Sequence, residues 1–407
     1  GLVIESFGGA AVAVREVLRV SDNGPAPHVV LAVASFVDAE SETYAPPLTF
    51  AGKDEYDAIL RDATRSGQAL QYSVSEGYPE LRQWIAAHMQ RLGVPATPDH
   101  ILVTSGSQQA LEFLGRLFIT EGDTVLVTAP TYLGALQAFS AYEPRYDTLM
   151  PEQGNRTPAS YRETSEKNGG SVKFGYVVPD FANPTGETLS VEARRGLLDL
   201  ARELDCPIIE DTAYVSLRYE GEAVPSVQAL DCATAGSLDN SRVIYCGSFS
   251  KVLTPGLRIG WVCAADPIIR RLTLIKQASD LNCSLINQMV MHRLAADTYD
   301  AQAAKASEHY RRRRDAMLAA LEAHMPAGTT WTRPEGGLFI WVTLPKHLVG
   351  AELLKRSIAE AGVAFVPGSA FYTDGSGKNT IRLSYSLPDE AMIAEGIARL
   401  GKLIAAS

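Results

Sequence analysis

The chain has 407 residues, of which 46% are hydrophobic and 21% charged, and its formal net charge at pH 7 is -10. This composition excludes a disordered protein, and the length predicts more than one hydrophobic core. The acidic balance argues against nucleic acid and anionic membranes as partners, because both are bound mainly through Lys and Arg.

The cysteines match neither a disulfide framework nor a zinc site, because they are odd in number, widely spaced and without a C-x-x-C pair. We expect buried free thiols and a reducing compartment, the cytoplasm. The longest apolar stretches, such as 29–37, are too short to cross a bilayer, and residues 1–18 do not resemble a signal peptide. No two His residues are spaced as H-x-x-x-H, and we expect no metal site.

Helix and strand signals alternate through the middle of the chain. Apolar residues at helical spacing predict helices over 81–92, 108–119 and 191–204. Short runs rich in β-branched residues predict strands over 100–104, 124–128, 173–178, 207–210 and 242–246. Residues 143–170 are polar and rich in Pro, Gly and Asn, and predict a connection with room for a short helix. This alternation predicts a mainly parallel sheet covered by helices on both faces.

The C-terminal part differs in pattern from the middle of the chain. It begins with a long predicted helix over 302–324, and strand signals follow at 338–343 and 380–386. We therefore expect a separate, smaller α+β unit. The expected division is a large domain over 46–290 and a small domain formed by 1–45 together with 291–407.

Ligands of parallel sheets bind at the carboxyl ends of the strands, so we expect the functional site in the loops that follow the predicted strands. The loop TSGSQQ at 104–109 opens a helix, where backbone amides and the helix dipole attract an anion and Ser107 adds a hydroxyl donor. The loop NPTG at 183–186 is a turn signal in which the Asn-Pro bond can be cis. Taken singly, the first loop also fits an ordinary N-cap and the second an ordinary turn.

Two further loops carry ionisable groups. The strand at 207–210 ends in Glu210 and Asp211, and the strand at 242–246 leads into Gly-Ser-Phe-Ser-Lys251, with Arg258 seven residues later. Taken alone, the two acids also fit a solvated strand end, and Lys251 also fits an ordinary surface lysine. Together, the four loops place an anion cradle, an acid, an amine and a guanidinium on one side of one sheet. Pyridoxal 5'-phosphate (PLP) requires such a set, because it has an aldehyde, a pyridine nitrogen and a phosphate to bind.

The ordered motifs SGSQQAL, APTY, NPTG, EDTAY, SFSK and GLRIGW resemble those of fold-type I PLP enzymes of the class I/II aminotransferase family. The pattern is most similar to the branch that contains aminoadipate and kynurenine aminotransferases. The strings PEGGLFIW, VPGSAFY and IRLSYS resemble the small domain of the same family, and the resemblance covers roughly 72–403. It implies an α/β fold with a mainly parallel seven-stranded sheet between helices, followed by a smaller α+β domain.

The resemblance also implies a role for each residue that matches a family motif. Lys251 forms the Schiff base with PLP and then moves a proton, Asp211 pairs with the ring nitrogen, and Arg382 binds the substrate α-carboxylate. The remaining contacts are Asn183 and Tyr214 at the phenolic oxygen, Asn183 also near the substrate, Tyr132 on the ring face, and Ser107, Gln108, Ser248, Arg258 and, more weakly, Ser250 around the phosphate. Tyr72 matches a tyrosine that reaches the phosphate of the neighbouring subunit, which implies a homodimer with composite sites.

Residues 29–47 depart from the family pattern. Relatives have a glycine-containing segment in the substrate pocket, whereas this stretch has no paired glycine and carries Asp38, Glu40 and Glu42. It is either a solvated loop or a pocket reshaped for a basic or atypical substrate.

Three functions are therefore considered. The first is an aminotransferase that moves nitrogen from an amino acid to a 2-oxo acid. The second is a PLP enzyme of elimination, replacement, decarboxylation or oxidative deamination. The third is a non-catalytic, aminotransferase-like sensor domain. Three observations argue against it: the catalytic set is complete, there is no basic face, and there is no room for a winged helix before Tyr72. The sequence does not identify the amino acid substrate.

Overall fold

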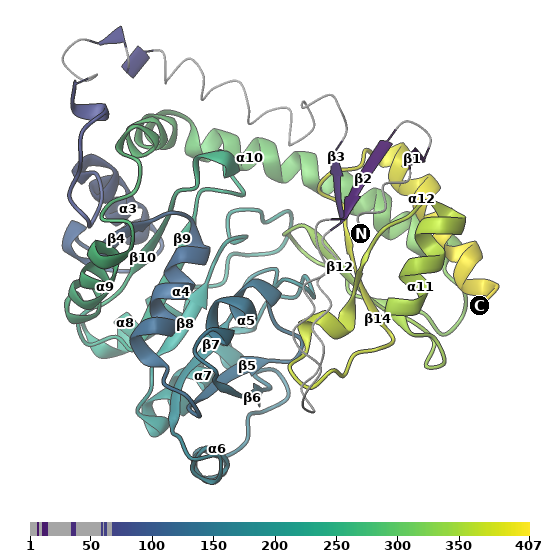
Figure 1. Cartoon of the computed structure of the whole chain (residues 1–407), viewed down its shortest axis with the longest axis horizontal. Helices are drawn as coiled ribbons and strands as arrows, with labels where there is room; N and C mark the ends of the chain where they lie inside the picture. Colours follow the sequence, from purple (N-terminus) through teal and green to yellow (C-terminus); the bar gives the residue numbers. More distant parts are fainter. Residues whose placement is uncertain (1–5, 8–9, 15–33, 38–57, 60, 63–66) are drawn as a thin grey trace.

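The computed structural model describes residues 6–7, 10–14, 34–37, 58–59, 61–62 and 67–407, and shows two units joined by one long helix (Figure 1). The larger unit is built on a seven-stranded sheet and the smaller unit on a four-stranded sheet. Near the N-terminus, β1 (Ser6–Phe7), β2 (Ala10–Val14) and β3 (Ala34–Val37) pair as an antiparallel sheet. Apart from β3, the atypical segment 29–47 lies outside the described residues, so the two interpretations of it stay predictions.

The large sheet has the strand order β4-β10-β9-β8-β7-β5-β6 and is parallel except for β10, which is antiparallel to both of its neighbours. The mainly parallel seven-stranded sheet that the sequence predicted is therefore confirmed. The strands are β4 (Ile101–Thr104), β5 (Thr124–Thr128), β6 (Arg145–Leu149), β7 (Val172–Val177), β8 (Ile208–Asp211), β9 (Val243–Ser248) and β10 (Gly260–Cys263).

Two strands of the large sheet, β6 and β10, are not predicted by the sequence. Strand β6 lies within 143–170, where only a connection and a short helix were expected. It is an edge strand whose residues are mostly half-buried, so its composition lacks the apolar run of a central strand. Strand β10 is fully buried, but it has only four residues and begins within the motif GLRIGW, directly after Arg258 and Ile259.

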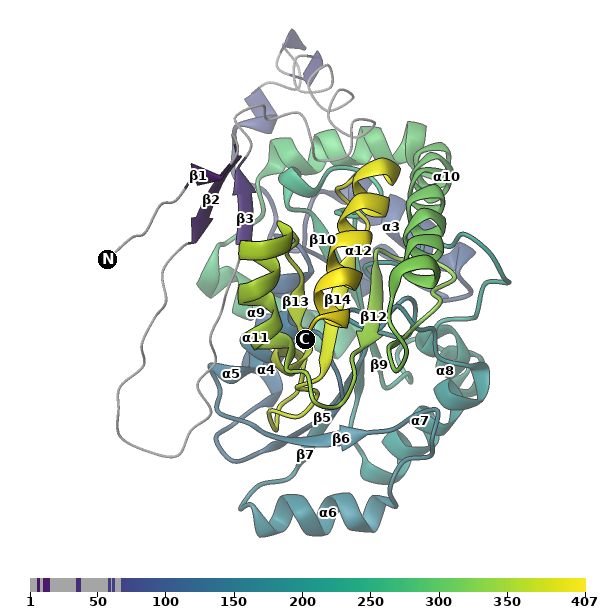
Figure 2. The same ribbon diagram turned by 90° about the vertical axis from the view of Figure 1, so that its right-hand side faces the viewer.

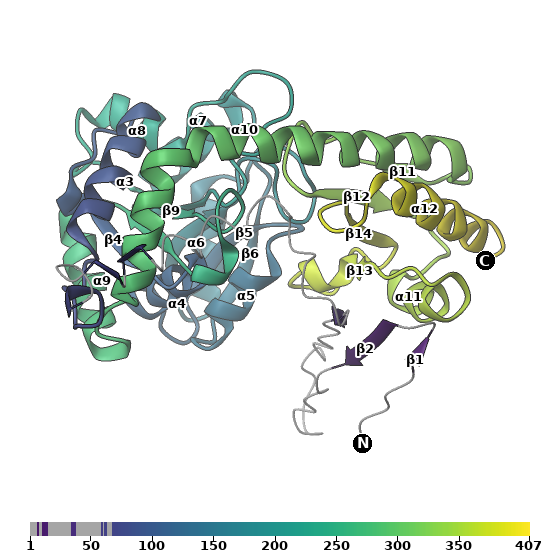
Figure 3. The same ribbon diagram turned by 90° about the horizontal axis from the view of Figure 1, so that it is seen from above.

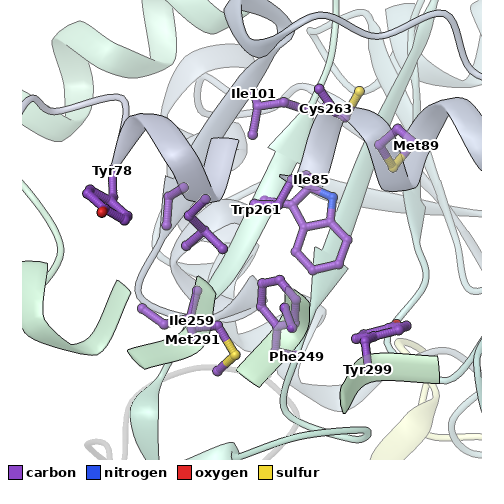
Figure 4. Packing of buried hydrophobic residues seen from close by; sticks show 14 of the residues in the cluster. Tyr78, Ile85, Met89, Ile101, Phe249, Ile259, Trp261, Cys263, Met291 and Tyr299 are labelled. Atoms are coloured by element: carbon purple, nitrogen blue, oxygen red, sulfur yellow. The ribbon is translucent and has the colours of Figure 1, made fainter. Parts of the chain in front are cut away.

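Alternate residues of the large sheet face opposite layers of helices, as the twofold period of a strand requires. Leu102, Ile244 and Val262 pack in the layer that includes α4, α5 and α9. Ile101, Tyr245 and Trp261 face the opposite layer, with α3 and the first half of α10. Figure 4 shows part of that second layer around Trp261. The helices of this unit are α3 (Pro79–Arg91), α4 (Ser107–Phe118), α5 (Leu133–Ser140), α6 (Pro158–Lys167), α7 (Val191–Leu204), α8 (Val227–Ala235) and α9 (Asp266–Ser279).

Helix α10 (Leu285–His324) has 40 residues and connects the two units (Figure 3). Sequence analysis placed its start at residue 302, which is too late. The first half packs in the core of the large unit through Leu285 and Met289, whereas the second half packs in the core of the small unit through Met317 and Leu321. Because the two halves bury their apolar residues in different cores, no continuous apolar stripe marks the helix as one element.

The small unit is an antiparallel sheet with helices beside it, and α12 packs along α10 (Figure 2). Its strand order is β11-β12-β14-β13. The elements are β11 (Thr330–Trp331), β12 (Phe339–Thr343), α11 (Gly350–Arg356), β13 (Val366–Pro367), η4 (Gly368–Phe371), β14 (Thr380–Ser384) and α12 (Glu390–Ala405).

The prediction of buried free thiols is confirmed, since all five cysteines are buried and unpaired. Among the helices of the described ranges, none combines the length and apolar character that a membrane crossing requires.

Candidate active site

A pocket lies at the carboxyl ends of β8 and β9 and at the start of α4. Most of the predicted site residues line it, and it also receives residues that follow β5 and β7. The lining consists of Ser107, Gln108, Tyr132, Val178, Asn183, Asp211, Ala213, Tyr214, Ser248, Ser250, Lys251, Pro255 and Arg258. Two predicted residues, Arg382 and Tyr72, are not part of this lining.

Asp211 is the last residue of β8 and its side chain is buried. Its Oδ2 accepts a hydrogen bond from the Tyr176 hydroxyl at 2.9 Å, whereas Oδ1 has no hydrogen-bond partner among the described residues. Burial raises the pKa of this carboxyl to about 6, although the bonds from Tyr176 and the Ala213 amide and the charge of Lys251 oppose that rise. A buried acceptor without a partner in a polar pocket fits a protonated nitrogen of a bound ring.

Lys251 follows β9 and faces Tyr214, with its Nζ 5.9 Å from the centre of the phenol ring. Burial lowers the pKa of Lys251, and so do the charges of Arg258 and Arg382, while Asp211 acts in the opposite sense. A lower pKa increases the fraction of neutral amine, which is the nucleophilic form. Burial also raises the pKa of Tyr214, so that its hydroxyl stays protonated and able to donate a hydrogen bond.

The turn between β4 and α4 forms an anion cradle. Gly106, the N-cap of α4, has φ 80° and ψ 166°, and a Cβ added there would lie 2.3 Å from Nη2 of Arg258. The guanidinium therefore lies directly against the turn whose next residue, Ser107, begins the helix. Ser248 adds a hydroxyl from the end of β9, where its Oγ accepts a hydrogen bond from the Ser250 amide at 3.1 Å. Helix amides, hydroxyls and a guanidinium together suit a phosphate.

Arg382 reaches the site from β14 of the small unit. Its Nη1 donates to Oδ1 of Asn183 at 2.7 Å, across a sequence separation of 199 residues. The guanidinium carbon lies 4.2 Å from the ring centre of Phe339 and 5.1 Å from that of Phe371. The buried Nε has no partner in the described part of the chain, so a donor remains for a carboxylate.

Tyr132 and Tyr72 differ in their placement. Tyr132 precedes α5 and lines the pocket, and Gly134 leaves space for its ring, since a Cβ there would lie 2.5 Å from the Tyr132 Oη. The side chain of Gln108 donates to the carbonyl of Gly134 at 2.6 Å, which ties the anion cradle to this turn. Tyr72 is 82% exposed and takes no part in the pocket of its own chain, so its predicted role toward a neighbouring subunit stays a prediction.

Three aromatic residues that contact the site residues were missed by sequence analysis: Tyr176, Phe339 and Phe371. The lining residues Val178, Ala213 and Pro255 were not predicted either. Each of the three aromatic residues lies in an apolar run or a short motif, where an aromatic residue is expected to fill the core. One signal was available for Tyr176, because a buried tyrosine hydroxyl usually needs a hydrogen-bond partner. Nothing in the sequence indicated that this partner is Asp211.

Comparison with known proteins identifies the family. The profile of the family described as aminotransferase class I and II matches residues 39–400. The aromatic-amino-acid aminotransferase 1 of Thermococcus litoralis is 40% identical over 405 residues, which cover 98% of this chain and 93% of that protein. The 2-aminoadipate transaminase of Thermus thermophilus is 39% identical over 360 residues, covering 88% of this chain and 87% of that protein.

Solved structures agree with these sequence matches. The crystal structure of Pyrococcus horikoshii kynurenine aminotransferase, which contains PMP, superposes with a TM-score of 0.80 at 41% sequence identity, covering 88% of this chain and 87% of that chain. These similarities support the aminotransferase interpretation and not elimination, decarboxylation or a sensor domain. The chain therefore belongs to the class I and II aminotransferases, a family of PLP-dependent enzymes.

Proposed function

We propose that this enzyme transfers the amino group of an aromatic amino acid, kynurenine or 2-aminoadipate to a 2-oxo acid, with PLP held by Lys251. The single observation that supports this proposal is that the pocket has an amine and an acid at one end and an anion cradle at the other. Lys251 and Asp211, whose Oδ1 has no partner among the residues described, line the same pocket as Ser107 and Arg258 of the anion cradle. The substrate class is taken from relatives whose names include these amino acids.

The residues present fit the cofactor at both ends. Oδ1 of Asp211 would accept a hydrogen bond from the ring nitrogen, and the side chains of Tyr214 and Asn183 would donate to the phenolic oxygen. The Tyr132 side chain would lie on the ring face. The phosphate would be bound by the amides that begin α4 and by Ser107, Gln108, Ser248 and Arg258.

When bound, PLP supplies an electron sink for the bonds at the substrate α-carbon. Arg382 would bind the α-carboxylate through its free Nε and thereby set the direction of the bond that breaks. The neutral amine of Lys251 would accept the proton removed from the substrate α-carbon, hold it and release it later in the reaction. Its lowered pKa suits this exchange, because the neutral amine is the base.

We also propose the domain division, the oligomeric state and the location of the protein. Separate hydrophobic cores around the two sheets support two domains, which we place at 46–290 and at 1–45 with 291–407. The core of the larger domain also takes in Met291, Leu294 and Tyr299, because the first half of α10 packs there. The exposure of Tyr72 and its apolar neighbours Leu70 and Val74 supports a homodimer in which Tyr72 serves the partner's phosphate site. Buried free thiols support the cytoplasm.

The test is a transamination assay on purified holoenzyme, with the proposed amino acids as donors and 2-oxoglutarate as acceptor. The variant Lys251→Ala is expected to lose turnover and borohydride-trappable cofactor. The variant Lys378→Ala, which removes an amine from an exposed turn, should keep both. Release of ammonia or carbon dioxide from a single amino acid, without any 2-oxo acid, would refute transamination as the net reaction.

A further inference from the structure

Tyr176 lies behind the Asp211 carboxyl, on β7, and is not part of the pocket lining. Its side chain is 0% exposed, and its hydroxyl donates to Oδ2 of Asp211 at 2.9 Å. In the parallel pairing of β7 with β8, Tyr176 lies opposite Ile209, two residues before Asp211. The two side chains therefore project from adjacent strands on the same face of the sheet.

The ring of Tyr176 is held by the core and has little freedom to move. Phe139 of α5 packs edge-on against it, with the ring centres 5.8 Å apart, and Phe139 also packs against Phe174 at 5.1 Å. All three rings belong to the buried layer beneath α4 and α5. A hydroxyl carried by such a ring has a fixed position, so its hydrogen bond fixes the carboxyl that accepts it.

The two oxygens of Asp211 have different environments. Oδ2 accepts the Tyr176 hydroxyl, whereas Oδ1 has no partner within the described ranges. We propose that Tyr176 is a positioning residue: it holds Oδ2 so that Oδ1 points at the cofactor ring nitrogen, and it keeps the carboxyl ionised. This inference rests on the proposed function, in which Asp211 binds the ring nitrogen.

Several titratable side chains surround the Asp211 carboxyl, but they differ in whether they hydrogen-bond it. The titratable groups that face the carboxyl are Lys251, Tyr132, Tyr176, Tyr214 and Cys246. Of these groups, Tyr176 is the one whose side chain hydrogen-bonds the carboxyl in the described structure. Burial raises the pKa of the Tyr176 phenol well above its ordinary value, so the hydroxyl remains a donor throughout the working pH range.

Removing this donor takes away the one side-chain hydrogen bond that the buried carboxylate receives within the described residues, and leaves the Ala213 amide as the remaining donor to it. Loss of a donor to a buried carboxylate favours the protonated acid, so the pKa of Asp211, already raised to about 6 by burial, would rise further. The ring nitrogen would then lose its anionic partner over more of the neutral range. We expect a variant without the hydroxyl to bind the cofactor more weakly and to need a higher pH for activity.

The experiment compares Tyr176→Phe with Tyr161→Phe. Tyr161 is also 0% exposed, and its hydroxyl donates to the Thr148 carbonyl at 2.8 Å, away from the pocket. Titration of apoenzyme with PLP should show about 10- to 100-fold weaker binding for Tyr176→Phe, the range of a hydrogen bond to a charged group, and no change for Tyr161→Phe. The acid limb of kcat should move to higher pH in Tyr176→Phe alone. Equal affinity and equal acid limbs in the two variants would overturn the proposal.

A double-mutant cycle tests whether Tyr176 acts through Asp211. In an Asp211→Asn background, Tyr176→Phe should weaken PLP binding by less than about threefold, which is close to the deviation seen between independent mutations. If Tyr176→Phe weakens binding in this background as much as it does in the wild type, Tyr176 acts independently of Asp211 and the proposal is overturned. PLP affinity is read without turnover, so a wild-type enzyme that binds PLP but does not transaminate would refute the proposed function and leave this inference standing.

A second substitution covers the case in which Tyr176→Phe does not fold. Incorporation of 3-fluorotyrosine at this position keeps the shape of the side chain and makes the phenol a stronger donor. The acid limb should then move to lower pH, opposite to the shift in Tyr176→Phe. An unchanged acid limb in the fluorinated protein would count against the proposal.

Discussion

Replacement of Gly106 by alanine adds one methyl group where the turn between β4 and α4 meets Arg258. The added Cβ would lie 2.3 Å from Nη2 and 3.0 Å from the guanidinium carbon, far inside contact distance. The guanidinium must therefore move away. In addition, φ 80° and ψ 166° form a combination that is essentially restricted to glycine, so the backbone is strained as well.

The two effects have separate magnitudes. Backbone strain of this kind costs about 1–3 kcal/mol of folding free energy. Displacement of Arg258 removes a charged hydrogen bond to the cofactor phosphate, worth about 1.5–3 kcal/mol, which corresponds to roughly 10- to 150-fold in PLP affinity. Gly106→Ala should therefore lower both the unfolding free energy of the apoenzyme and its affinity for PLP.

A matched control separates strain from displacement. Gly236, the C-cap of α8, has φ 77°, and a Cβ added there would have no heavy atom within 4 Å. Gly236→Ala should cost stability through a strained backbone, about 1 kcal/mol, and leave PLP affinity unchanged. Affinity is measured by absorbance titration of the apoenzyme, and stability by urea unfolding. If Gly106→Ala binds PLP as tightly as Gly236→Ala does, Arg258 is not part of the phosphate site and the reasoning fails.

Three further predictions concern the substrate, pH and the dimer. Arg382→Lys loses the planar fork between two aromatic rings and should lower kcat/KM by about 10- to 100-fold with PLP affinity retained; an unchanged kcat/KM would contradict the carboxylate role. Burial raises the pKa of Glu210 from 4.5 to about 7, so this acid binds a proton more readily in the folded state and its contribution to stability falls as pH rises through that window. The free energy of unfolding, measured in urea below and above this pH window, should fall less for Glu210→Gln than for the wild type. An identical fall in the two proteins would disprove the raised pKa of Glu210. Inactive Tyr72→Ala and Lys251→Ala chains should regain activity when co-expressed, because a hybrid dimer contains one intact composite site; no recovery would refute the composite site.

Much of the site could be predicted from the sequence because its parts lie in local motifs. A ligand site at a strand end needs a short strand followed by polar residues, and this pattern is visible at Asp211, Ser248 and Lys251. The parallel arrangement follows from the alternation of helices and strands, since parallel strands require crossover connections. The carboxyl ends of such strands meet at one edge, so the pocket that contains these residues could be anticipated.

Other features were invisible because their signals depend on neighbours in space. The edge strand β6 lacks an apolar run, since one of its sides has no neighbouring strand in the structure as described. The apolar stripe of the first half of α10 does not continue into the second half, because the two halves pack in different hydrophobic cores. In both cases the tertiary environment determines which residues are buried, and periodicity alone cannot supply that environment.

The sequence by itself determined the alternation of helices and strands through the middle of the chain, the family and the chemical groups available at the strand ends. Only the tertiary structure decided how those groups act on one another. It placed Arg382 against Asn183 across 199 residues, and it gave one oxygen of Asp211 a tyrosine partner while the other has none in the part of the chain that the structure describes. The physical reason is that motifs specify residue types and local backbone, whereas hydrogen-bond partners and pKa values depend on burial and on contacts between distant segments.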